Sequence, residues 1–140
     1  MYTHSVEIRV RYSETDKMGY VYYGNYTHYY EVGRVEALRS LGITYRELED
    51  DYKIFLPVTN VQVRYLRPAY YDNLLRLETS IIKLPTSKID FTTVIYNEKN
   101  ELINQGQVQL CLIDGTTMKK MEAPDFIIKK LIHYFGEAKE

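Results

Sequence analysis

The chain has 140 residues, of which 45% are hydrophobic and 26% are charged, which is the balance of a globular protein with one core. The formal net charge is −1 and the isoelectric point is near 6.3, so we expect no partnership with nucleic acid or an anionic membrane surface. No apolar run approaches the ~20 residues that span a bilayer, and the first residues have no signal-peptide pattern. We therefore expect one domain over residues 1–140, without membrane insertion, in the cytoplasm.

The residues that bind metals or form disulfides are sparse. The single cysteine, Cys111, excludes an internal disulfide, and its place in an alternating apolar run favours a buried, unreactive thiol. The three histidines, His4, His28 and His133, have no metal-ligand spacing, so we expect no metal and no cofactor. The Gly-x-Ser-x-Gly motif of α/β-hydrolases is also missing.

The first predicted element is a half-buried strand over residues 4–12. Its apolar residues, from Val6 to Tyr12, alternate with polar ones and face one way. A polar, glycine-containing loop follows over residues 13–24. It holds one well-placed carboxylate, that of Asp16.

A long helix is predicted after this loop. Asn25 is a candidate N-cap, the helix runs to about Leu41, and Gly42 stands where a left-handed residue is wanted. Gly33 costs the helix roughly 1 kcal/mol relative to Ala, which predicts a close approach to a sheet. The residues that share the core-facing stripe are Tyr26, Tyr30, Gly33, Ala37 and Leu41.

From Leu56 onward the hydrophobic period changes to two, which predicts about four strands joined by short turns. A short helix with a capping box over residues 44–51 precedes them, and an amphipathic helix beginning at Pro124 follows. The strands are expected at Val61–Tyr65, Leu75–Ile81, Ile89–Ile95 and Leu102–Ile113, and the last helix buries Ile128, Leu131, Ile132 and Phe135.

Short connections predict an antiparallel sheet, and burial of the long apolar helix requires that sheet to wrap around it. The expected class is therefore α+β with one central helix. The outer sheet face also carries apolar residues, which predicts a homo-oligomer. These residues are Ile82, Val94, Tyr96 and Ile113.

The junction between loop and helix is the strongest functional lead. Asp16 offers a base or a nucleophile beside the backbone N–H groups of a helix start, which stabilise a developing oxyanion. Six of the fifteen tyrosines lie between Tyr20 and Tyr30.

The motifs around this junction resemble those of a known family. RYSETD, GYVYYGNY and YYEVGR are similar to hotdog-fold acyl-CoA thioesterases of the 4-hydroxybenzoyl-CoA thioesterase type, and VRYLRPAYYDNLLRLET resembles that family's second and third strands. The resemblance covers nearly the whole chain. It implies a hotdog fold, an antiparallel sheet around a long central helix, and hydrolysis of an acyl-CoA to a carboxylic acid and coenzyme A. It also implies a homodimer or homotetramer, with the active site between subunits.

The resemblance assigns roles to individual residues. Asp16 matches the catalytic acid, which acts either as a nucleophile or as a general base for water. Tyr23 matches the position whose backbone N–H polarises the substrate carbonyl. Gly19 would let the loop pass close to the thioester, and Tyr20 and Tyr22 are candidates for the substrate pocket.

Other residues are expected to support the active site or to bind the coenzyme A part of the substrate. Asn25 would orient the oxyanion donors as the N-cap. Glu31 and Arg34 are three residues apart and are expected to form an ion pair, although another hotdog branch carries its catalytic acid on the helix, so Glu31 is the alternative carboxylate. The cations that could meet the phosphates of coenzyme A are Lys88, Lys119 and Lys120.

Two other functions stay open from the sequence. One is a non-catalytic acyl-CoA-binding protein, since a fold does not establish an activity. The other is a hotdog dehydratase acting on 3-hydroxyacyl thioesters, which needs a catalytic histidine. His28 lies on the predicted helix, but its surroundings do not resemble those of the dehydratases.

Overall fold

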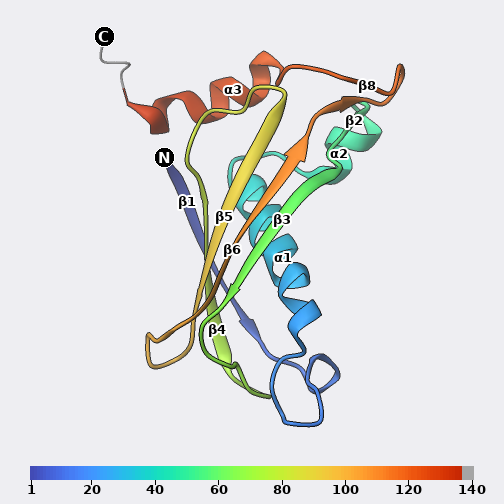
Figure 1. Cartoon of the computed structure of the whole chain (residues 1–140). Helices are drawn as coiled ribbons and strands as arrows, with labels where there is room; N and C mark the ends of the chain where they lie inside the picture. Colours follow the sequence, from blue (N-terminus) through green and yellow to red (C-terminus); the bar gives the residue numbers. More distant parts are fainter. Residues whose placement is uncertain (137–140) are drawn as a thin grey trace.

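The computed structural model describes residues 1–136 (Figure 1). A five-stranded antiparallel sheet has the strand order β1-β4-β5-β6-β3, and the long helix α1 (Tyr26–Ser40) lies against one of its faces. The strands are β1 (Tyr2–Arg9), β3 (Val58–Tyr65), β4 (Leu74–Ile81), β5 (Lys88–Tyr96) and β6 (Leu102–Cys111). The α+β arrangement of a sheet around a central helix is confirmed.

Shorter elements complete the chain. The helices are α2 (Tyr45–Asp50) and α3 (Asp125–Leu131), with 3-10 helices η1 (Tyr12–Glu14), η2 (Tyr23–Asn25) and η3 (Ile132–Phe135). A second, small sheet was not predicted, because its strands of two residues are too short to show a period. It consists of β2 (Ile54–Phe55), β7 (Ile113–Asp114) and β8 (Lys119–Lys120). Among residues 1–136, no helix is long and apolar enough to span a membrane.

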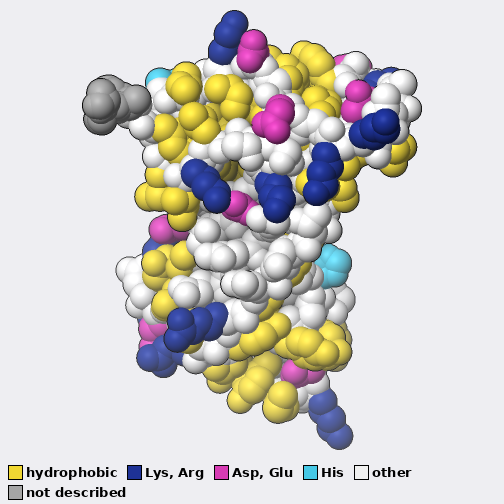
Figure 2. Space-filling model, turned by 45° about the horizontal axis from the view of Figure 1, so that its top comes forward, with side chains coloured by type: hydrophobic (Ala, Val, Ile, Leu, Met, Phe, Trp, Pro, Cys, Tyr) yellow, Lys and Arg dark blue, Asp and Glu magenta, His cyan; other side chains and the backbone are white. Residues whose placement is uncertain are grey.

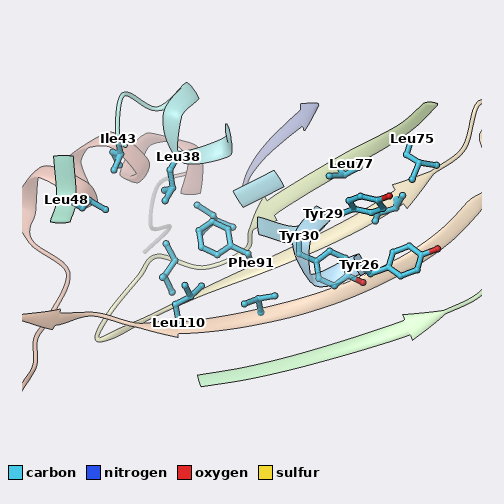
Figure 3. Close-up of a cluster of buried hydrophobic side chains, with 14 of the residues drawn as sticks. Tyr26, Tyr29, Tyr30, Leu38, Ile43, Leu48, Leu75, Leu77, Phe91 and Leu110 are labelled. Atoms are coloured by element: carbon cyan, nitrogen blue, oxygen red, sulfur yellow. The ribbon is translucent and has the colours of Figure 1, made fainter. Parts of the chain in front are cut away.

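Alternation along the strands creates the core. In β4 and β5 every second side chain is buried, and α1 packs against β1, β4 and β5. Figure 3 shows side chains of α1, including Tyr29, Tyr30 and Leu38, between the strands and the helix. The buried hydrophobic side chains form one cluster.

Two glycines have the conformations that the sequence predicted. A Cβ on Gly33 would overlap Oγ1 of Thr79 on β4, so the missing side chain allows helix and sheet to approach. Gly42 follows the helix with φ +82, the left-handed conformation that ends it. The short helix α2 is capped as expected, since Oγ1 of Thr44 accepts a hydrogen bond from the Glu47 N–H at 3.1 Å.

Two predicted faces are wrong. Tyr12 does not continue the buried side of the first strand; β1 ends at Arg9, and Tyr12 is 79% exposed in η1, where the period-two pattern no longer applies. In α3 the buried residues are Ile127 and Leu131, whereas Ile132 is exposed. At Ile132 the α-helix gives way to the 3-10 helix η3. With three residues per turn, the Ile132 side chain no longer lies on the buried face of α3.

The edge strand β3 is the least covered part of the sheet. Most of its residues are exposed, including Val58, Val61 and Tyr65. The helix α1 packs against β1, β4 and β5, whereas β3 lies at the opposite edge of the sheet from β1, beyond β6. This leaves an exposed edge strand with unpaired backbone groups on its outer side.

Candidate active site

The loop between β1 and α1 folds over one end of the sheet. In the antiparallel order, β1 and β3 run in the same direction and therefore end at that same end. The Val21 N–H donates to the Ala69 carbonyl at 2.8 Å, and Tyr20 and Tyr70 form a backbone bridge. The loop that holds Asp16 is thus fixed to the segment that follows β3.

Within this loop, Asp16 is held by one of its two carboxylate oxygens. Its Oδ1 accepts hydrogen bonds from the backbone N–H groups of Met18 at 2.9 Å and Tyr20 at 3.2 Å. Gly19 has φ +82 and closes this turn. No group in residues 1–136 donates a hydrogen bond to Oδ2. One oxygen therefore orients the side chain, and the other is not engaged by the described residues.

The helix start differs from the prediction at Asn25. The backbone of Asn25 is already helical, with φ −80 and ψ −11, because η2 begins two residues earlier and runs into α1. A side-chain cap needs an extended backbone, and Asn25 makes none. Its Nδ2 instead donates to the Glu14 carbonyl at 2.8 Å, which ties the loop to the helix.

The Tyr23 amide is the first N–H of η2. Among residues 1–136 it has no hydrogen-bond acceptor, as is usual for the first N–H of a helical segment. The hydroxyl of Tyr65, at the end of β3, donates to the Tyr23 carbonyl at 3.2 Å. The helix start is therefore linked to the edge strand.

Asp16 and the Tyr23 segment line one cleft, with a volume of about 520 Å³. Tyrosine rings supply much of its wall, and Figure 2 shows hydrophobic side chains gathered at this lower end of the molecule. Burial raises the pKa of Tyr26 to about 12 and also raises that of Tyr65, so both hydroxyls are neutral at physiological pH. The lining residues are Asp16, Lys17, Met18, Tyr20, Val21, Tyr22, Tyr23, Tyr26, Tyr65, Leu66, Arg67 and Pro68.

The cleft unites most of the residues that the sequence singled out. Asp16, Tyr20, Tyr22 and Tyr23 all line it, and Gly19 lies in the turn that holds Asp16. Lys88 does not, because it begins β5 at the opposite end of the sheet.

The structure adds two cations that the sequence analysis did not assign. Lys17 and Arg67 both line the cleft and are exposed. A usable signal existed for Arg67, since an antiparallel order in which β1 and β3 run the same way places their last residues at the same end of the sheet.

The expected ion pair between Glu31 and Arg34 is wrong. Within the described residues the two side chains form no salt bridge. Arg34 is buried and donates from Nε to the hydroxyl of Tyr45 at 3.0 Å, whereas Glu31 is exposed. The long arginine side chain reaches α2 and leaves Glu31 in solvent. Glu36 and Arg39 pair instead, at 3.3 Å.

Residues 1–136 hold no group of three or more His, Cys, Asp or Glu side chains that could bind a metal ion. His28, the residue weighed for dehydratase chemistry, is exposed on α1 and does not line the cleft. The expectation of no metal and no cofactor stays a prediction.

Comparison with known families decides the relationship. Residues 18–104 match the family model of the thioesterase superfamily. This chain belongs to that superfamily. The match begins two residues after Asp16 and includes Tyr23, all of α1 and the strands from β3 to β5.

Individual members of the thioesterase superfamily support the assignment. The acyl-CoA thioester hydrolase YbgC of Escherichia coli is 32% identical over 121 residues, which cover 86% of this chain and 90% of that protein. The structure of a DHNA-CoA thioesterase from Staphylococcus aureus is 31% identical, with a TM-score of 0.85 over 99% of this chain and 98% of that one. A 4-hydroxybenzoyl-CoA thioesterase, at 17% identity, shares the fold with a TM-score of 0.83 over 93% and 99% of the two chains. The hotdog fold is confirmed.

Proposed function

We propose that this protein is an acyl-CoA thioesterase, which hydrolyses an acyl-CoA to a carboxylic acid and coenzyme A. The observation that carries the proposal is the meeting of the Asp16 carboxylate and the Tyr23 segment in one apolar cleft. The names of the E. coli and S. aureus relatives support the same reaction class.

Each of the two groups has a part in thioester hydrolysis. The Tyr23 N–H would donate to the carbonyl oxygen and stabilise the negative charge that develops there. Oδ2 of Asp16 would attack the carbonyl carbon, so that the C–S bond breaks, coenzyme A leaves as the thiolate, and water cleaves the resulting mixed anhydride. Alternatively, Oδ2 would remove a proton from a water that attacks the same carbon. The tyrosine wall strengthens either step, because charges interact more strongly where water is excluded.

A homodimer or homotetramer is part of this proposal. The edge strand β3 exposes Val58 and Val61 by 46% and 42%, and its unpaired backbone groups can pair with a second copy. Tyr65 belongs both to this edge and to the cleft, so a contact there would lie beside the site. A two-fold axis across β3 would also bring the Lys88 end of one subunit toward the cleft end of the other. Lys88 therefore stays a candidate for the coenzyme A phosphates.

We also assign the reaction to the cytoplasm. The free thiol of Cys111 is buried, which is compatible with a reducing compartment.

The test is incubation of the purified protein with a panel of acyl-CoA esters, with release of the coenzyme A thiol followed by a chromogenic disulfide. We expect multiple turnovers with at least one ester. Tight binding in calorimetry without thiol release would instead identify a binding protein, and an enoyl product from a 3-hydroxyacyl-CoA would identify a dehydratase. Light scattering of the same sample should show a dimer or tetramer, and a strict monomer would contradict the proposed subunit contact.

A further inference from the structure

A second acid, Glu14, precedes Asp16 by two residues in the same loop. It is partly buried and does not line the cleft. Its Oε1 accepts a hydrogen bond from the Arg11 N–H at 2.8 Å, which closes η1, and another from the Tyr29 hydroxyl at 2.8 Å, which comes from α1. The carboxylate of Glu14 therefore joins the loop to the central helix.

The backbone carbonyl of Glu14 binds the start of that helix. It accepts a hydrogen bond from the Tyr22 N–H at 2.8 Å and another from Nδ2 of Asn25 at 2.8 Å. These two donors stand on either side of Tyr23 in the sequence. One residue of the loop thus contacts both the segment that carries the Tyr23 amide and the body of α1, and it lies two residues from Asp16.

Tyr29 is a fixed anchor for this arrangement. It is 2% exposed, and its ring packs edge-to-face on Tyr26 with the centroids 5.8 Å apart. Figure 3 shows its ring within the buried cluster. Burial and the Glu14 carboxylate both raise the pKa of the Tyr29 hydroxyl, so the hydroxyl keeps its proton and donates it to Glu14. The core therefore determines where Glu14 lies.

We propose that Glu14 is a positioning residue, whose hydrogen bond to Tyr29 sets the spacing between the Asp16 carboxylate and the Tyr23 N–H. The proposal rests on the thioesterase function, in which one group must reach the carbonyl carbon while the other meets the oxygen of the same carbonyl. The Asp16 turn orients its own side chain but does not fix the turn relative to the helix. A displacement of about 1 Å between such groups costs about 10²-fold in rate.

The experiment removes each end of this hydrogen bond. Glu14→Ala and Tyr29→Phe should each lower kcat and kcat/KM for the fastest acyl-CoA ester of the panel by about ten-fold, with KM within about two-fold, because only the placement of the reacting groups changes. Glu14→Gln should keep the rate within about three-fold, because its amide oxygen accepts the same two hydrogen bonds. A wild-type kcat in Glu14→Ala, or a loss that Glu14→Gln does not restore, overturns the proposal.

Thr15→Val is the matched control. Thr15 stands between the two acids, but its hydroxyl donates to the Tyr12 carbonyl at 2.7 Å, within the loop, so this variant should keep the wild-type kcat. The double variant of Glu14→Ala and Tyr29→Phe should lose no more than the larger single loss, because both changes break one bond. Losses that multiply would contradict a shared role. If Glu14→Ala does not fold, Tyr29→Phe still decides, since it removes only a hydroxyl and keeps the ring in the core.

Failure of this inference is distinguishable from failure of the proposed function. A wild type that hydrolyses an ester supports the thioesterase whatever the Glu14 variants do. If the wild type hydrolyses none, amide hydrogen exchange tests the contact alone. The Tyr22 N–H, which the Glu14 carbonyl accepts, should exchange at least ten-fold faster in Tyr29→Phe, because the loop is then less firmly held to the helix. An equal exchange rate in the two proteins overturns the proposal.

Discussion

Substitution of Gly33 by Ala tests the close packing of α1 on the sheet. The new Cβ would overlap Oγ1 of Thr79 and lie 3.6 Å from its Cβ and 3.8 Å from Cδ2 of Leu77. Thr79 cannot move freely, because it is fully buried and shares a hydrogen bond of 3.1 Å with Thr93. The clash therefore falls on a rigid part of the core.

Two opposing effects set the size of the change. Ala favours the helix over Gly by about 1 kcal/mol, whereas overpacking of a core costs about 1–3 kcal/mol and a broken buried hydrogen bond about 1–3 kcal/mol more. The costs exceed the gain, so we expect Gly33→Ala to lower the free energy of unfolding by about 1–5 kcal/mol.

Urea unfolding followed by circular dichroism measures this difference, at one fixed protein concentration because an oligomer's stability depends on it. The control is the same substitution in a Thr79→Ala background. With the obstacle removed, only the helix preference remains, and Gly33→Ala should become neutral or stabilising there. A Gly33→Ala protein as stable as the wild type, or an equal loss in both backgrounds, would refute the packing argument.

Two further predictions concern the loop and the tyrosine core. Gly19→Val should lower kcat/KM for thioester hydrolysis by about ten-fold, because the left-handed backbone that closes the Asp16 turn costs an L-residue about 1–2 kcal/mol, whereas Gly19→Asn should stay within a few-fold; equal rates for the two variants would speak against the turn. Burial raises the pKa of Tyr26 to about 12 and raises those of Tyr29 and Tyr30 as well, so the unfolded chain ionises first. The stability from these neutral phenols should be complete below pH 10 and lost as the pH rises through 12. Absorbance at 295 nm should then show the buried tyrosines ionising only with unfolding, and their ionisation near pH 10 in the folded protein would contradict the burial.

The parts of the fold that follow from local periodicity could be predicted. The alternation of β4 and β5, the left-handed Gly42 and the close approach at Gly33 all depend on residues near in sequence or on the absence of one side chain. The residue pattern was therefore sufficient to predict the strands β4 and β5, the end of the helix α1 at Gly42 and the packing of α1 on the sheet.

The errors near the site and along α1 concern choices between competing partners. Asn25 could cap a helix or hold the loop, and it holds the loop because η2 starts the helical backbone earlier. Arg34 had Glu31 within reach along the helix, but it binds Tyr45 from α2 instead. Spacing along the sequence shows which partners a side chain can reach, whereas the tertiary packing determines which partner it binds.

Predicting the residues that line the cleft required the relative directions of β1 and β3 as well as the sequence motifs. Asp16 and Tyr23 stood out from the sequence, whereas Arg67 and Tyr65 join them only because β1 and β3 end at the same end of the sheet.

The most direct test of the account is the single-turnover rate of thioester cleavage by Asp16→Asn. Asp72→Asn is the matched control, because Asp72 is also a loop aspartate but lies outside the cleft. The account predicts a loss of at least ~10²-fold in the rate of the chemical step for Asp16→Asn, with acyl-CoA affinity nearly kept, and a wild-type rate for Asp72→Asn. An unchanged cleavage rate in Asp16→Asn would contradict the central claim that its free carboxylate oxygen performs the chemistry.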